Sequence, residues 1–241
     1  DGDLKSARFN QPYGVALDAA QTTLYVADYL NHAIRRINLV LEKVDTLAGN
    51  GAPGFADGRR GTARFNQPYN VRVDGLGRIW VPDQLNHAVR RVTPAGEVST
   101  VAGSGKAGYI DGATTAAQFN NPTGIAPLPN GAAVVADRNN NRLRLVTPDG
   151  SVTTLAGNGE AGFADGPVAN ARFNQPLDVD FDDSMSRILV SEDKGHRLRV
   201  DGMVNHAPNG NGEGMQVARF VQRLRAAGYV TEAIDPQQGN V

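Results

Sequence analysis

A six-residue motif recurs four times along the chain and strongly limits the folds that are open to it. It reads Ala7-Arg8-Phe9-Asn10-Gln11-Pro12 at first and returns, with small changes, at residues 63–68, 117–122 and 171–176. Its phenylalanine stands at positions 9, 65, 119 and 173, so successive copies lie 56, 54 and 54 residues apart. A fixed period of this size is typical of repeated supersecondary units, each needing its neighbours to bury an apolar face. We therefore expect the shared residues to be scaffold and the function to lie where the copies differ.

One period contains four short strand-like segments. In the first copy these are residues 13–18, 24–28, 31–37 and 44–49, and the fourth copy lacks a counterpart of the last segment. Val15 and Leu17 alternate with small or polar residues, as in a half-buried strand, and Val71 and Val73 repeat this pattern. The tight turns and the missing helical period predict an all-β chain of four-stranded antiparallel sheets. Radial repetition of such sheets is a β-propeller.

The repeat pattern ends near residue 200, which predicts a propeller domain over 1–200 and a separate region over 201–241. Residues 205–214 are rich in glycine and asparagine and predict a linker. Apolar spacing over 215–227 predicts a C-terminal helix. Residues 229–234 could then form a strand that completes the last sheet, or belong to a region that only begins here.

Composition excludes several classes of function. The chain has 24 Lys+Arg against 25 Asp+Glu, so no overall positive charge attracts nucleic acid. No apolar run is long enough to span a bilayer, and the absence of cysteine excludes disulfides and thiolate chemistry. Because the chain begins at Asp1 without a leader, we expect a processed or excised product, with a secreted or cell-surface location favoured.

Three further patterns make the repeats similar to a known family. These are the glycine-rich loops at 48–58, 102–112 and 156–166, the Phe-Asn-x-Pro segments and the Ala-Asp-x-x-Asn-His segments. Over residues 1–200 the chain resembles the NHL repeats, in a subtype with long glycine-rich loops between blades. The resemblance implies a propeller, commonly of more than four blades, so we expect pairing with further blades or a second chain. Family members serve mostly as platforms for protein, glycan or RNA, and related propellers include lyases and hydrolases.

Two motifs admit a sharper interpretation that we weigh against a structural one. The loops contain Gly-x-Gly-x-x-Gly at 49–54, 103–108 and 157–162, but a dinucleotide site needs a helix to follow, so inter-blade turns and no cofactor are predicted. His32, His87 and His196 share one repeat position, which is Asn141 in the third copy. Since a carboxamide can replace an imidazole as a hydrogen-bonding group but not as a usual metal ligand, we predict a structural role and no metal.

An arginine and an acid recur once per repeat, and a guanidinium among apolar neighbours needs a carboxylate. We therefore predict structural ion pairs between Asp28 and Arg35, Asp83 and Arg90, Asp137 and Arg144, and Glu192 and Arg199. A phosphate-binding ring of arginines is the alternative. The aspartates before glycine, Asp57, Asp111 and Asp165, are predicted to form Asx turns rather than calcium sites.

Two connections at one end of each predicted blade change class between copies while their flanks hardly change. These candidate binding positions are Tyr13, Tyr29, Leu30, Tyr69, Gln84, Leu85, Arg138, Asn139, Asp193 and Lys194. Exposed tyrosines and leucines favour a binding face, although ordinary variation in surface loops gives the same pattern. We predict a non-catalytic module that binds a protein or glycan. The alternatives are a lyase-like or hydrolase-like propeller with a metal or polar site at its channel, and a module for single-stranded RNA.

Overall fold

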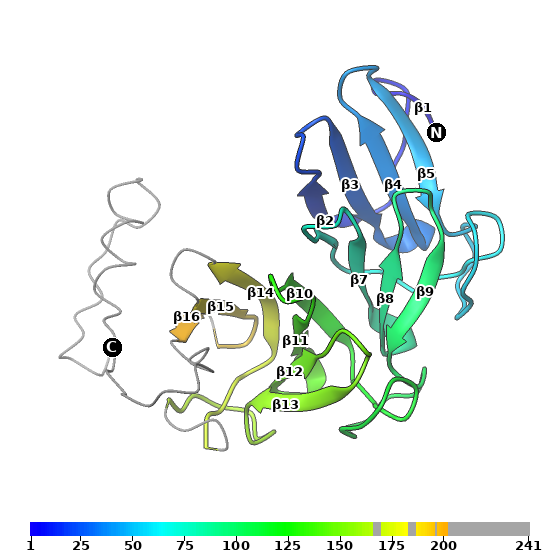
Figure 1. Cartoon of the computed structure of the whole chain (residues 1–241). Coiled ribbons are helices and arrows are strands. Elements are labelled where there is room, and N and C mark those ends of the chain that lie inside the picture. The colour runs from blue at the N-terminus through cyan, green and yellow to red at the C-terminus, as the bar shows by residue number, and fades with distance from the viewer. Residues whose placement is uncertain (166–169, 183–186, 196, 202–241) are drawn as a thin grey trace, which may run out of the picture.

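Each repeat forms one antiparallel sheet in the computed structural model, which describes residues 1–165, 170–182, 187–195 and 197–201. The four sheets follow one another in chain order and form the blades of a β-propeller, as predicted (Figure 1). The predicted helix over 215–227 and strand over 229–234 lie outside the described residues. No helix within the described part of the chain is long and apolar enough to cross a membrane.

The first blade contains β1 (Gly2–Asp3), β2 (Pro12–Leu17), β3 (Thr23–Asp28), β4 (Ala33–Asn38) and β5 (Lys43–Ala48). The second contains β6 (Arg72–Val73), β7 (Ile79–Asp83), β8 (Ala88–Val92) and β9 (Val98–Ala102). The third contains β10 (Pro122–Pro127), β11 (Ala133–Asp137), β12 (Arg142–Val146) and β13 (Val152–Ala156). The fourth contains β14 (Pro176–Asp182), β15 (Arg187–Glu192) and β16 (Arg197–Asp201) among the described residues. Short 3-10 turns, η1 (Tyr29–Asn31), η2 (Gln84–Asn86) and η3 (Arg138–Asn140), join the second and third strands of the first three blades.

Strand order places the first strand of each blade at one edge of its sheet, next to the first strand of a neighbouring blade. The pairing of this strand is interrupted near its start, because the register shifts between Pro12 and Val15 and again between Pro122 and Ile125. In the second blade the first strand is the short β6, and the Asn70 side chain before it accepts the N–H of Val71 at 2.8 Å. These irregular starts bring backbones close together at the centre of the propeller.

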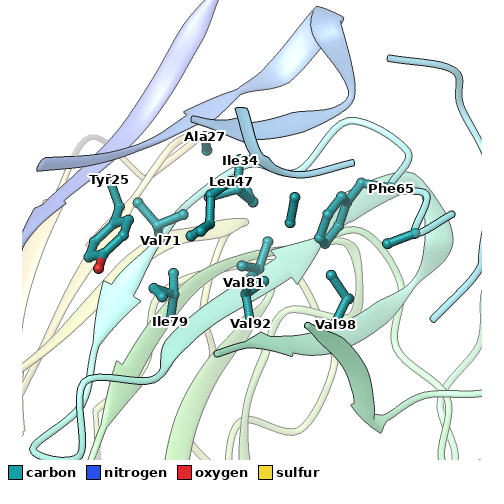
Figure 2. Close-up of a cluster of buried hydrophobic side chains, with 12 residues drawn as sticks. Tyr25, Ala27, Ile34, Leu47, Phe65, Val71, Ile79, Val81, Val92 and Val98 are labelled. Atoms are coloured by element: carbon teal, nitrogen blue, oxygen red, sulfur yellow. The ribbon is translucent and has the colours of Figure 1, made fainter. Parts of the chain in front are cut away.

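Apolar side chains on facing sheets form the core. Figure 2 shows Ala27, Ile34 and Leu47 of the first blade packed over a larger set from the second. This larger set consists of Phe65, Val71, Ile79, Val81, Val92 and Val98. Burial of such side chains is the main source of stability, so each blade depends on its neighbour as the repeat pattern predicts.

The outer face of the first blade differs from its counterparts. Val15 and Leu17 were predicted to be half-buried, yet 53% and 45% of them are exposed. Their equivalents in the second blade, Val71 and Val73, are fully and partly buried, because the first blade covers them. The strand is therefore as predicted, and the difference comes from the position of this blade in the array.

Candidate functional site

Three tyrosines from two blades meet at one end of the sheets. Tyr13 lies on β2, Tyr29 on η1, and Tyr69 just before β6. The Tyr13 and Tyr69 rings stack with centroids 4.7 Å apart, and Tyr29 meets Tyr13 edge-on at 4.9 Å. Half of Tyr13, 51%, is exposed. We call Tyr13, Tyr29 and Tyr69 the tyrosine cluster.

Polar side chains border the tyrosine cluster. The Tyr29 hydroxyl donates to Gln84 Oε1 at 2.9 Å. Across the site, Arg138 Nη2 donates to the Asp193 carboxylate and to Gln175 Oε1. Burial raises the pKa of Tyr29 and of Tyr69, so both hydroxyls keep their protons at neutral pH. The border therefore combines an amide, a hydroxyl and a neutralised ion pair.

The remaining predicted positions lie at the same end of the sheets. The backbone N–H groups of Leu30, Leu85 and Asn139 each donate, at 3.0 Å, to a backbone carbonyl oxygen of the repeat motif in the same blade. The accepting residues are Asn10, Asn66 and Asn120. These bonds hold the connection between the second and third strands beside the segment before the first strand. Leu85, Asn139 and Lys194 are exposed, and Leu30 is half-buried. The variable positions thus share one face, and among the described residues the tyrosines, Gln84, Arg138 and Asp193 make side-chain contacts within it.

A second polar group lies nearer the centre of the propeller. Asn70 Nδ2 donates to Asp178 Oδ1 at 2.8 Å, and Arg72 Nη2 donates to Asp178 Oδ2 at 2.9 Å. Burial raises the pKa of Asp178, and the Arg72 guanidinium opposes this shift. These three residues link the first strands of the second and fourth blades. We call them the central polar cluster.

Sequence reasoning missed the central polar cluster, although a signal was present. The repeat position of Asn70 and Asp178 is glycine in the other two blades, Gly14 and Gly124. A Cβ atom at Gly14 would lie 2.5 Å from the Cα atom of Asn70, and one at Gly124 would lie 2.5 Å from that of Asp178. Glycine therefore allows the close approach that brings the two polar side chains together.

The recurring acids and arginines lie together within each blade. Nη1 of Arg35, Arg90 and Arg144 donates to the carboxylate of Asp28, Asp83 and Asp137 at 2.7 Å, and that of Arg199 to Glu192 at 3.4 Å. The carboxylates also accept a backbone N–H of the repeat motif, as Asp83 does from Asn66 at 2.7 Å. Burial raises the pKa of Asp83 to about 6 against the attraction of Arg90. These carboxylates and the first three arginines are buried, so the pairs are parts of the blade interior.

Each arginine has a second carboxylate partner that the sequence reasoning assigned differently. Nη2 of Arg90 donates to Asp57 at 2.7 Å, and the same aspartate accepts the hydroxyl and the backbone N–H of Thr100. Asp111 and Asp165 bind Arg144 and Arg199 in the same way, at 2.6 Å. For Asp57 and Asp111 the prediction of Asx turns was therefore wrong, because strand and arginine donors bind the oxygens that such a turn would use. For Asp165 the turn residues 166–169 lie outside the described residues.

The shared histidine position joins neighbouring repeats. His32 Nδ1 accepts the backbone N–H of Gln67, and His87 Nδ1 accepts that of Asn121, both at 3.1 Å. In the third blade, Asn141 Oδ1 accepts the backbone N–H of Gln175 at 3.0 Å. An imidazole nitrogen accepts only while it is unprotonated. His196 and His206 lie outside the described residues.

A pH dependence of stability follows from these bonds. Burial lowers the pKa of His32 and of His87 below their ordinary value of 6.5. The unfolded chain then binds more protons below that value, so stability falls as the pH drops through the lowered pKa. Because Asn141 shows that asparagine can make the bond, the double variant His32→Asn/His87→Asn should lose part of this slope in melting midpoint. The pKa of Asp83 is raised to about 6, so this carboxyl makes stability rise as the pH falls. Wild type and the double variant share this contribution, which therefore cancels when their melting midpoints are compared. An unchanged slope would contradict the role given to the two histidines.

The described residues contain no group of three or more histidine, cysteine, aspartate or glutamate side chains that could hold a metal ion. The glycine-rich loops lead into β-structure, and the loop at 103–108 is followed by a bridge between Ile110 and Gln118. Phosphate groups bind well at the N-terminus of a helix, which this loop does not supply. The chemistry available at the site is therefore that of aromatic rings, amides and paired charges.

Comparisons with known proteins agree with the blade geometry. A family model described as NHL repeat matches residues 119–144. NHL repeat-containing protein 2 of Bos taurus is 30% identical over 236 residues, a match that covers 83% of this chain and 32% of that protein. This chain spans 26% to 32% of the length of the curated relatives it matches.

Solved structures share the arrangement. A protein of unknown function from Bacteroides thetaiotaomicron has a TM-score of 0.67 and 26% identity, with 79% of this chain and 47% of that chain covered. An auxiliary nutrient binding protein from the same organism has a TM-score of 0.65 and 20% identity, with 78% and 46% covered. With the repeat model, the relatives and the geometry of the blades in agreement, the chain belongs to the NHL-repeat family of β-propeller proteins.

Proposed function

We propose that this chain is a non-catalytic binding module and that the tyrosine cluster with its polar border is its ligand site. The observation that carries the proposal is the convergence of three tyrosines from two blades, with half of Tyr13 exposed. Aromatic faces beside fixed amide and hydroxyl groups suit a sugar ring, and tyrosine and arginine are also enriched where proteins bind tightly. A glycan or a protein segment is the ligand class that fits this chemistry.

Two features support binding rather than chemistry at this position. Arg138 is paired with Asp193 and Tyr29 with Gln84, so the polar groups are held in place rather than left free to transfer protons. The structural neighbour described as a nutrient binding protein adds support at the level of the fold. Ligand contact would cover the exposed part of Tyr13 and add to the ring contacts already present.

The test measures binding of the full chain to an array of neutral and acidic oligosaccharides, followed by titration of the best oligosaccharide. Tyr13→Ala should weaken binding about tenfold or more, because truncation of a central aromatic anchor commonly has this effect. Leu76→Ala is the matched control, since Leu76 is 75% exposed and lies at the turn before β7, away from the cluster. A ligand bound equally by wild type and Tyr13→Ala would place the site elsewhere. If no glycan binds, the protein arm of the proposal is tested by photo-crosslinking from position 13.

An enzyme is the second candidate, favoured by the central polar cluster. Burial raises the pKa of Asp178, and Arg72 Nη2 lies 2.9 Å from Asp178 Oδ2. A carboxyl with a shifted pKa beside a positive charge is suited to acid-base chemistry. Turnover of a lactone or ester substrate by wild type, lost in Asp178→Asn while Tyr13→Ala stays active, would favour this candidate.

Single-stranded RNA has weaker support as a ligand. Stacking on aromatic rings would suit RNA bases, but a positively charged groove is also needed. At this face Arg138 is neutralised by Asp193, and the chain as a whole has a net charge of -1.

A further inference from the structure

The second blade carries a buried tryptophan with two arginines beside it. Trp80, on β7, is wholly buried and packs with residues of the neighbouring blade such as Phe119 and Ile125. Arg91, on β8, pairs with Trp80 across the antiparallel ladder, and its guanidinium carbon lies 5.7 Å from the indole ring. Because Trp80 stands near the start of β7 and η2 follows the end of that strand, this group and the tyrosine cluster lie at opposite ends of the blades.

Asp74 holds the indole and the second arginine, Arg78. Its Oδ2 atom accepts Arg78 Nε at 2.7 Å and Trp80 Nε1 at 2.8 Å, and its Oδ1 atom accepts the backbone N–H groups of Leu76 and Arg78. Burial works against the charged form, yet the hydrogen bonds from Trp80 and Arg78 lower the pKa of Asp74, so the carboxylate keeps its charge. Each of its oxygens already has two donors. In the described part of the chain, Nη1 and Nη2 of Arg78 have no hydrogen-bond acceptor.

Arg91 has lost the carboxylate that its equivalent keeps. In the first blade this position is Arg36, whose Nε and Nη2 donate to Asp45 at 3.0 and 2.9 Å. Asp45 lies opposite Arg36 in the ladder, whereas Ser99 lies opposite Arg91. Among the residues that the structure describes, no acceptor forms a hydrogen bond with the Arg91 guanidinium, which contacts the Trp80 ring instead.

The charges beside Trp80 do not balance. Burial and the charge of Arg78 both lower the pKa of Arg91, which nevertheless remains a cation at neutral pH. Asp74 offsets one of the two guanidinium charges, so one positive charge is left on the group. The fork of N–H donors on an arginine matches the oxygens of a phosphate in pairs, and such charge-assisted hydrogen bonds are strong. A half-buried guanidinium with unused donors beside a second cation is therefore suited to a phosphate group.

We propose that Arg91 and Arg78 form a binding site for a phosphate group, which takes the place that Asp45 holds in the first blade. The site is separate from the tyrosine cluster and from the recurring pairs of arginine and acid, so it adds a second ligand to the binding module. Free inorganic phosphate and the end of an organic phosphate ester present the same oxygens to the two guanidinium groups. The experiment distinguishes these two sources.

Trp80 is the only tryptophan of the chain, so its fluorescence reports directly on this site. The full chain is titrated with inorganic phosphate at constant ionic strength, with chloride as the balancing anion. We expect a saturable change in emission and a rise in the melting midpoint, since a ligand that binds only the folded chain stabilises it. In a parallel titration, tighter binding of glycerol phosphate would assign the site to an organic phosphate, and tighter binding of inorganic phosphate would assign it to the free ion.

Two variants test the geometry. Arg91→Leu should weaken phosphate binding about tenfold or more, because it removes hydrogen bonds to a charged ligand. Leucine suits this repeat position, as Leu145 shows in the third blade. Ser99→Asp should weaken binding as strongly without removing an arginine, because its carboxylate would pair with Arg91 as Asp45 pairs with its own arginine. Arg36→Leu is the matched control, since it removes the same charge from a position that is already paired, and it should bind phosphate like wild type.

A saturable change that persists in Arg36→Leu and is lost in Arg91→Leu and Ser99→Asp would support the site. The absence of a saturable change in wild type with either phosphate would overturn it, as would equal affinities for wild type and Ser99→Asp. If Arg91→Leu does not fold, Ser99→Asp decides the question alone, because Ser99 is exposed and its replacement leaves Trp80 and both arginines in place.

Discussion

Replacing Arg144 with alanine is expected to lower the free energy of unfolding by about 3–5 kcal/mol, the range for removing one partner of a buried ion pair. The side chains of Arg144 and Asp137 are both fully buried, and Nη1 lies 2.7 Å from the carboxylate. Asp137 would keep only Asn120 and Asn140 as donors, so its charge would remain buried without an opposite charge. Thermal and urea unfolding of the two proteins measure the difference.

Two controls separate this effect from a general effect of losing an arginine. Arg138→Ala, at the border of the tyrosine cluster, should change stability by less than about 1 kcal/mol, because its pair with Asp193 is partly exposed. Arg199→Ala should cost less than Arg144→Ala, since its contact with Glu192 is longer at 3.4 Å. The loss in Arg144→Ala should also shrink in mild acid, because Asp137, whose pKa burial already raises, can then take up a proton. A wild-type melting midpoint for Arg144→Ala would contradict this account.

Phe119→Ala is the second large change, with an expected loss of about 3–5 kcal/mol, as for other fully buried phenylalanines. Phe119 is wholly buried, packs against β10 and β11 residues such as Ile125 and Val135, and lies beneath Arg144. Its truncation would leave a cavity between the second and third blades. Denaturant unfolding measures this change in free energy, provided that the slope of free energy against denaturant concentration is the same for both proteins.

The chain contains its own control for this prediction. Phe9 occupies the same repeat position but is partly exposed, so Phe9→Ala should cost clearly less than Phe119→Ala. Equal losses at the two positions would show that the phenylalanine acts within its own blade rather than at the joint between blades.

The repeats made most of the fold predictable from sequence. The four sheets follow from the period, and the strands follow from alternation of apolar residues, because these patterns are local. The contacts of Asp83 with Arg90 could be anticipated in the same way, since both residues recur at a constant spacing of seven positions. Local patterns determine local partners, and the exposure of Val15 and Leu17 departs from them because no sheet among the described residues covers the outer face of the first blade.

The candidate site was harder to predict from the sequence than the fold, for a geometric reason. The tyrosine cluster was predicted as a face, but its stacking depends on where β2 and β6 approach each other. The central polar cluster was missed because Asn70 and Asp178 are 108 residues apart, and each is packed against the glycine at the same repeat position of another blade. Contacts of this kind depend on the curvature of the whole array, which no single repeat encodes.

The arginine network has a consequence for how such a chain can change in length. The partners of Arg90 lie between Phe55 and Arg90 itself, and those of Arg144 lie between Tyr109 and Arg144. A segment cut from one glycine-rich loop to the next therefore keeps every ionic partner that it needs. Gene duplication or deletion of one whole period would preserve these buried charges, whereas a shift of a few residues would separate them. The network thus favours growth and shortening of the array by complete blades.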